Sequence, residues 1–178
     1  MTDPLSATDW LDEGLKTLAE RGFTALKAEP LAKAMGVSRG SFYWHFADIG
    51  SFHAAILRRW REVAADQIIA NVEAASGHDD PLAVLLRQAF GGRLTLEKAV
   101  RGWAALDPLA RRAVAAMDRR RLSYVEDLLK RAGLPPAVAR ARAQILYWAF
   151  VGFALSDQPL PRGRQQAILD ELLRMAQR

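Results

Sequence analysis

The sequence contains no cysteine and no long uncharged apolar run, and each absence excludes a class of structure. Without cysteine, neither a disulfide framework nor a cysteine-ligated metal site is possible. The longest uncharged apolar run, Ile145 to Leu155, is too short to cross a bilayer. Met1 to Trp10 is polar and acidic, with no basic segment before an apolar one, so we expect no signal peptide and a cytoplasmic protein.

Motifs of common enzyme chemistry are also scarce. The chain has no cysteine nucleophile, no phosphate loop of the GxxxxGK type and no HExxH, and it has only three histidines. We therefore predict a protein that is not an enzyme and uses no cofactor. His78, Asp79 and Asp80 lie side by side in a polar stretch, but neighbouring ligands without a distant partner favour a solvated loop over a metal site.

The most informative stretch is Gly36 to Phe46, which reads GVSRGSFYWHF. Gly36 is placed to end a short helix, expected from about Pro30 to Met35, because glycine commonly occupies the left-handed position after a helix. The hydroxyl of Ser38 can then cap a second helix. The pattern therefore predicts a helix, a tight turn and another helix.

In this stretch the apolar residues separate from the polar ones. Phe42 and Phe46 are four apart and share a helix face, so we expect them in a small core. In a helix-turn-helix, the second helix offers its N-terminal residues to base edges while flanking polar groups hold phosphates. The alternative is a packed corner of two helices with no DNA contact, and the pattern alone leaves both open. The residues left outside the core are Arg39, Gly40, Ser41, Tyr43, Trp44 and His45.

Leu31 to Phe46, reading LAKAMGVSRGSFYWHF, resembles the helix-turn-helix signature of the TetR family of bacterial transcriptional repressors. The resemblance implies a homodimer with an N-terminal DNA-binding domain and a larger helical domain that binds a small inducer. It makes Arg39, Gly40 and Ser41 the end nearest the bases, and Tyr43 and His45 phosphate contacts. The predicted partners are a double-stranded operator and a small-molecule effector. The predicted DNA-binding residues are Lys27, Arg39, Gly40, Ser41, Tyr43, Trp44 and His45.

Two positions depart from the family pattern. Ile49 stands where a phosphate-binding lysine is common, and Glu29 precedes Pro30 where a serine or threonine cap is usual. We predict that Glu29 caps the helix with Pro30 at its first position. A carboxylate there implies an unusual operator or weaker binding. Ile49 and Glu29 also leave an alternative function open, that of a helical ligand-binding or partner-binding protein whose motif no longer reads DNA specifically.

The net charge of +5 does not itself indicate DNA binding. Up to Phe46 the basic residues are balanced by acidic ones, and the basic excess lies later, from Arg101 to Arg142. The DNA-binding prediction therefore depends on the motif.

Helical periodicity and helix-stop residues continue along the rest of the chain. We predict an all-α protein, with a three-helix DNA-binding domain at residues 1–50 and a connector helix plus a ligand-binding and dimerisation domain at residues 51–178. The helices are expected at Ala7 to Arg21, Ser51 to Ala75, Leu82 to Phe90, Leu94 to Trp103, Pro108 to Arg131, Ala137 to Leu155 and after Gly163.

Arg121 interrupts the apolar stripe of the helix from Pro108 to Arg131. A buried cation is costly unless it is paired, so an arginine there needs a partner. One hypothesis is an anionic or carbonyl-bearing ligand; the other is an internal ion pair or a side chain that reaches water. The predicted effector-binding residues are Trp103, Met117, Arg121, Tyr124 and Tyr147.

The run ILYWAFVGFAL, from Ile145 to Leu155, is apolar on every side of its helix. Such a helix has to be buried all round. Ala149 and Gly152 would allow another helix to approach closely. The resemblance implies that the last two helices pair with those of a second copy; a central helix of a monomeric bundle is the alternative.

Overall fold

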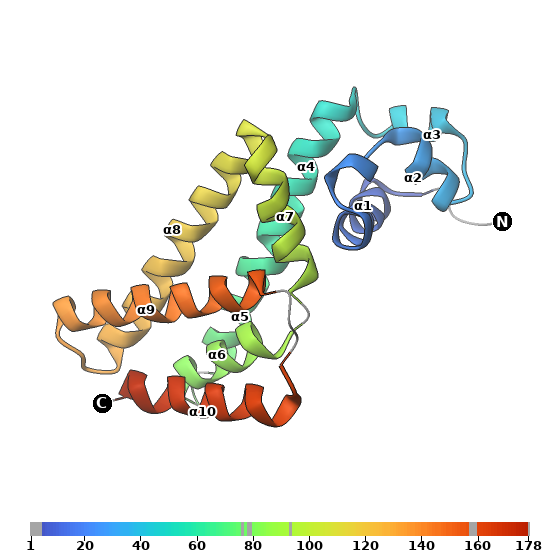
Figure 1. The fold of residues 1–178 in the computed structure, drawn as a ribbon. Coiled ribbons are helices and arrows are strands. Elements are labelled where there is room, and N and C mark those ends of the chain that lie inside the picture. The colour runs from blue at the N-terminus through green and yellow to red at the C-terminus, as the bar shows by residue number, and fades with distance from the viewer. Residues whose placement is uncertain (1–4, 76, 78–79, 93, 157–159, 178) are drawn as a thin grey trace. The chain divides into compact units, whose positions relative to one another are not determined.

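The structure is a computed structural model that describes residues 5–75, 77, 80–92, 94–156 and 160–177, and the regular structure of these residues is helical (Figure 1). The predicted all-α class is confirmed. A 3-10 turn at Phe23–Ala25 and a π-helical turn at Glu62–Asp66 accompany the α-helices. These helices are α1 (Ala7–Arg21), α2 (Ala28–Ala34), α3 (Arg39–Tyr43), α4 (Ile49–Arg61), α5 (Gln67–Ala75), α6 (Pro81–Gly91), α7 (Thr95–Leu106), α8 (Pro108–Arg131), α9 (Pro136–Leu155) and α10 (Arg162–Gln177).

The chain forms two compact units. Unit 1 comprises Met1–Val63 and Leu94–Ala115, and unit 2 comprises Ala64–Arg93 and Ala116–Arg178. The connector therefore passes from one unit to the other within the π-helical turn, and α8 contributes to both units. The functional division at residue 50 stays a prediction, because it concerns roles and not compactness.

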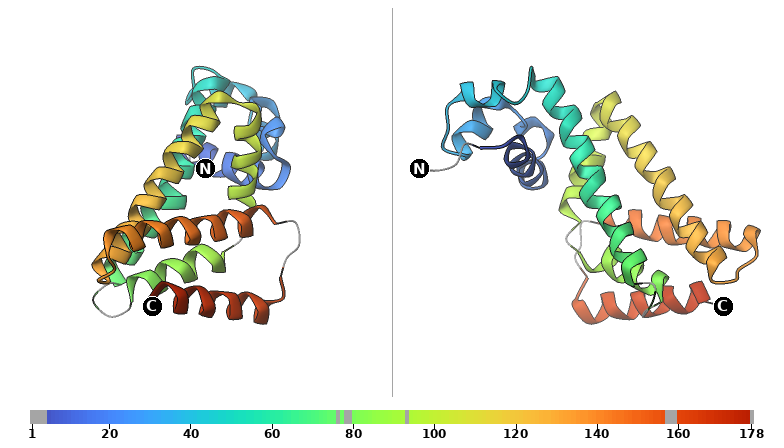
Figure 2. Two further views of the ribbon diagram at one scale, coloured as in Figure 1. Left: turned by 60° about the vertical axis from the view of Figure 1, so that its left-hand side comes forward. Right: turned by 180° about the vertical axis from the view of Figure 1, so that it is seen from behind.

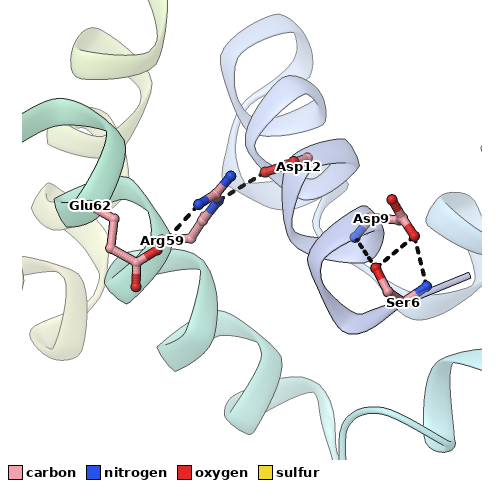
Figure 3. A network of polar contacts seen from close by, with 5 residues as sticks. All are labelled: Ser6, Asp9, Asp12, Arg59 and Glu62. Atoms are coloured by element: carbon pink, nitrogen blue, oxygen red, sulfur yellow. Dashed lines mark hydrogen bonds and ion pairs between the residues drawn. The ribbon is translucent and has the colours of Figure 1, made fainter. Parts of the chain in front are cut away.

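Unit 1 is built on α1, which packs against α4 and α7. A capping box starts α1, with Ser6 and Asp9 each bonding the other's backbone N–H (Figure 3). Farther along, Asp12 accepts a hydrogen bond of 2.9 Å from Nε of Arg59 on α4, and Glu62 accepts one of 3.3 Å from Nη1 of the same arginine. The two helices are thus joined by charge as well as by their apolar faces.

The predicted ends of α1 and the predicted end of the connector at Ala75 are confirmed, whereas the start of the connector and its continuity are wrong. Gly22 follows α1 at φ +77 and donates its N–H to the carbonyl of Leu18 at 3.0 Å. The connector starts at Ile49 because Asp48 caps it, accepting from the N–H of Ser51 at 2.6 Å. The π-helical turn then interrupts what we predicted as one continuous helix.

Unit 2 contains α5, α6, α9, α10 and the later part of α8, and α6 lies between α9 and α10 (Figure 2). The predicted start of α8 is confirmed, since the carboxylate of Asp107 accepts from the N–H of Ala110 at 2.8 Å. Gly133, at φ +92, closes the same helix. None of the helices in the described part of the chain is long and apolar enough to cross a membrane.

A substitution at Gly14 tests the close contact between α1 and α4. A Cβ at this position would lie 2.4 Å from Cδ1 of Ile56 and 2.8 Å from Cζ of Phe52, and both side chains are fully buried. We expect Gly14→Ala to lower the free energy of unfolding by about 1 to 3 kcal/mol through overpacking. Denaturant unfolding followed by circular dichroism measures the change.

The matched control is Gly102→Ala in α7, where a Cβ meets nothing within 4 Å. It should raise the free energy of unfolding by roughly 0.5 to 1 kcal/mol, because alanine favours a helix interior more than glycine does. Equal effects of the two substitutions would contradict the close packing at Gly14.

Candidate functional site

A tight turn joins α2 to α3. Gly36 adopts φ +70, which is open to glycine at no steric cost, and its N–H donates to the carbonyl of Lys33 at 3.3 Å. The next N–H, of Val37, reaches the carbonyl of Ala32 at 3.0 Å. These two bonds satisfy carbonyls at the end of α2 and reverse the chain, so the predicted helix, turn and helix are confirmed.

Phe42 fixes the orientation of α3. Its side chain is fully buried, and its ring centroid lies 5.4 Å from that of Trp10, 5.2 Å from Phe46 and 5.2 Å from Phe52. The predicted pairing of Phe42 with Phe46 in the core is confirmed. Because one face of so short a helix is held inside, its opposite face has to point to solvent.

That opposite face carries most of the predicted DNA-binding residues. Tyr43 is 47% exposed and Trp44 is 87% exposed. Arg39, Gly40 and His45 are exposed too, and Ser41 is half-buried. Lys27 is exposed at the residue that precedes α2. These side chains therefore form a polar and aromatic surface and do not pack in the core.

Arg39 and Tyr43 are joined on this surface. Nη2 of Arg39 donates to the Tyr43 hydroxyl at 3.0 Å, and the guanidinium carbon lies 5.6 Å from the centroid of the tyrosine ring. The hydrogen bond to Tyr43 raises the pKa of Arg39 above its ordinary value, and the charge of Glu29 adds a smaller contribution. The guanidinium therefore has a partner before any DNA arrives.

The predicted caps around the motif are wrong in detail. α2 begins at Ala28 with Lys27 as its cap residue, so Glu29 lies in the first turn and Pro30 is its third residue. Proline is tolerated there because the N–H groups of a first turn have no intrahelical partner. Ser38 occupies the cap position of α3, but its hydroxyl does not bond to the helix. Ile49 is the first residue of α4 and 38% exposed.

The letters GVSRG, at 36–40, also fit the GxSxG pattern of serine hydrolases. That motif depends on a sharp turn from a strand into a helix, with the serine at its apex. Here the turn joins two helices, and the described residues contain no strand. Nor do they contain a group of three or more histidine, aspartate or glutamate residues placed to hold a metal ion. His78 and Asp79 lie outside the described residues.

The family model for bacterial regulatory proteins of the tetR family matches residues 11–56, which span α1, the turn and the start of α4. Over these residues the chain carries the DNA-binding domain of tetR-family regulators. It is accordingly a DNA-binding transcriptional regulator of the TetR type, and regulators of that family are not enzymes, as we predicted. None of the proteins with curated descriptions matches the chain.

Solved structures agree over nearly the whole chain. A TetR-family member from Streptomyces coelicolor A3, SCO1917, is 28% identical, with 92% of this chain and 95% of that one covered and a TM-score of 0.63. The multidrug binding protein EbrR, solved with imidazole, is 26% identical, with 96% of each chain covered and a TM-score of 0.62. BioQ, solved with its double-stranded DNA operator, is 18% identical, with 97% of this chain and 98% of that one covered and a TM-score of 0.54.

The predicted effector-binding residues fall into different parts of this TetR fold. Trp103 is buried in unit 1, where it stacks on Phe23 at a centroid distance of 4.6 Å and meets the edge of His53 at 5.5 Å. His53 in turn donates from Nε2 to the carbonyl of Leu26 at 2.9 Å. Trp103 therefore supports the segment that leads into α2, and its role toward an effector stays a prediction.

Met117, Arg121, Tyr124 and Tyr147 belong to unit 2. Met117 is buried, and the Tyr147 hydroxyl donates to Oδ1 of Asp118 at 2.5 Å. The Tyr124 hydroxyl donates to Oε1 of Glu73 on α5 at 2.7 Å. Arg131 also binds Glu73, and together the two hydrogen bonds lower the pKa of Glu73 to about 2. The burial of Tyr124, followed by its hydrogen bond to Glu73, raises the pKa of Tyr124 to about 12.

Arg121 has a structural partner in the connector. Its Nη2 donates to the carbonyl of Ala64 at 3.1 Å, inside the π-helical turn, and its guanidinium lies 5.2 Å from the centroid of the Phe150 ring. The adjacent Arg120 forms an ion pair of 2.7 Å with Asp66. Sequence reasoning anticipated that Arg121 needs a partner but not that a backbone carbonyl supplies it. The contacts of Arg59 with Asp12, of Arg120 with Asp66 and of Arg131 with Glu73 carried no sequence signal, because these partners are far away in the chain.

Arg121→Met separates the structural and ligand-binding interpretations of this side chain. We expect the free protein to lose about 1 to 3 kcal/mol of unfolding free energy, since a charged hydrogen bond and a cation–π contact both disappear. Arg119→Met, an exposed position on the same helix, should change stability by less than about 0.5 kcal/mol. A methionine variant as stable as the wild type would leave ligand binding as the reason for Arg121.

Proposed function

We propose that this TetR-family protein is a cytoplasmic one-component repressor that binds a palindromic operator and is released by a small-molecule effector. The observation that carries the proposal is the exposed face of α3, held outward by the buried ring of Phe42. BioQ, which shares the fold, is solved on its operator. The side chains offered to DNA are those on the exposed face, led by Arg39 and Tyr43.

A second copy of the chain completes the DNA-reading surface in this proposal. α9 carries an exposed apolar stripe with successive steps of three and four residues, the spacing of a helix that packs against another helix. At Gly152 a Cβ would meet nothing within 4 Å, so a partner helix has room to approach. α10 adds Ile168 and Met175, which are 40% and 51% exposed. The stripe consists of Val138, Ala141, Ile145, Trp148, Gly152 and Leu155.

The effector site belongs to unit 2 in this proposal, near the aromatic rings around Arg121. The relative EbrR was solved with malachite green as well as with imidazole, so the fold accommodates aromatic ligands in that protein. An effector shifts a conformational equilibrium only by its differential affinity for the two states. Arg121 offers a route, because its hydrogen bond reaches Ala64 in the connector. A ligand that takes over this guanidinium would release the π-helical turn.

The alternative is a helical ligand-binding protein whose motif no longer reads DNA. Glu29 favours it, since a carboxylate close to Arg39 repels phosphate. Ile49 favours it as well, because it offers no charge at the start of α4. The exposed surface on α3 favours DNA binding more strongly than these two residues oppose it, since it combines a cation with hydrogen-bond donors.

Fluorescence anisotropy against duplex DNA tests operator binding directly. We expect the purified chain to prefer the duplex immediately upstream of its own gene by about a hundredfold or more over a shuffled duplex, at the same near-physiological salt. The double variant Arg39→Ala, Tyr43→Phe should lose that preference. Equal, weak and salt-sensitive binding to that duplex, its shuffled form and every duplex selected from a random pool would contradict the proposed function.

Trp148→Glu tests the second copy. Trp148 is 64% exposed in the single chain, and a central tryptophan commonly contributes about 2 to 4 kcal/mol to an interface. We therefore expect a dimer for the wild type and a monomer for the variant in sedimentation equilibrium at micromolar concentration. Ser123→Glu, an exposed position on α8, is the control and should stay dimeric. A variant that remains dimeric would place the interface elsewhere.

A further inference from the structure

The contact between Arg39 and Tyr43 has a consequence for sequence recognition. We propose that the Tyr43 hydroxyl positions the Arg39 guanidinium to read a guanine, so that base discrimination depends on a tyrosine whose own predicted DNA contact is a phosphate. The inference deepens the proposed function and rests on it. It assigns a specificity role to Tyr43 that a simple phosphate contact would not have.

The hydrogen bond leaves Arg39 most of its donors. A guanidinium carries five N–H groups in a planar fork, and the 3.0 Å bond to Tyr43 uses one of them. The remaining donors match the O6 and N7 acceptors of guanine, the pair that arginine most often recognises in the major groove. The base class predicted at this position is therefore guanine.

The Tyr43 ring packs on one side against the core of unit 1. It meets the buried ring of Phe42 edge to face, at 5.3 Å and 84°. The spacing of four residues puts Arg39 on the same side of α3, one turn earlier. An exposed arginine normally samples many rotamers and loses that freedom on binding. Here the hydroxyl and the ring together restrict it in the free protein.

The same hydroxyl remains able to serve the DNA backbone. A tyrosine hydroxyl both donates and accepts, so accepting from Arg39 leaves its own O–H to donate to a phosphate. Removing the hydroxyl should therefore cost two things together, a phosphate contact and the orientation of Arg39. His45, exposed beyond the end of α3, provides the contrast of a predicted phosphate contact alone.

The experiment measures base discrimination with a single-atom change in the DNA. An operator duplex is first selected from a random pool with the full-length wild-type protein. Each guanine is then replaced in turn by 7-deazaguanine, which lacks the N7 acceptor but still pairs with cytosine. Anisotropy titrations compare the wild type with Tyr43→Phe, Arg39→Ala and His45→Ala, whose folding is checked by thermal melting.

At one guanine of each half-site we expect 7-deazaguanine to weaken wild-type binding by about tenfold. In Tyr43→Phe and Arg39→Ala that penalty should shrink to about twofold or less. His45→Ala should bind more weakly than the wild type yet retain the full tenfold penalty, because it loses only a phosphate contact.

A full penalty in Tyr43→Phe would overturn the positioning role while leaving the proposed function intact. The inference also fails if no guanine gives a penalty that Arg39→Ala removes. If the random pool yields no preferred duplex, the proposed function fails, and this inference fails with it.

Discussion

The burial of Phe42 is the interaction on which the rest of the DNA-binding face depends. α3 has only five residues, far fewer than a helix needs to be stable in isolation. Its position is therefore set by what its one inward side chain contacts. Trp10, Phe46 and Phe52 come from different segments and converge on that ring. Loss of any of these contacts would move the exposed side chains without changing them.

Local rules explain what could be predicted from the sequence. Gly22 and Gly36 are needed where the backbone enters positive φ, and Asp107 before Pro108 is a helix start that requires no distant partner. These signals depend on neighbouring residues alone. They were enough for the all-α class, most helix ends and the face of α3 that reaches solvent.

Long-range contacts determine the features that could not be predicted from the sequence. Nothing in the run EVAAD, at 62–66, breaks a helix, and the π-helical turn there coincides with contacts from Arg120 and Arg121 some 50 to 60 residues later. Trp103 has the size and aromatic character expected of a ligand contact, but the structure stacks it on Phe23. A single sequence does not reveal which distant segment such a side chain meets.

Gly14 also determines where the connector is able to bend. With no side chain between them, α1 and the first half of α4 pack too closely to slide past each other, and Arg59 ties them together at Asp12. We therefore expect these two helices to move together. Any flexing of the connector is then expected beyond Arg59, in the π-helical turn at Glu62–Asp66, where the regular α-helical hydrogen-bonding pattern is interrupted.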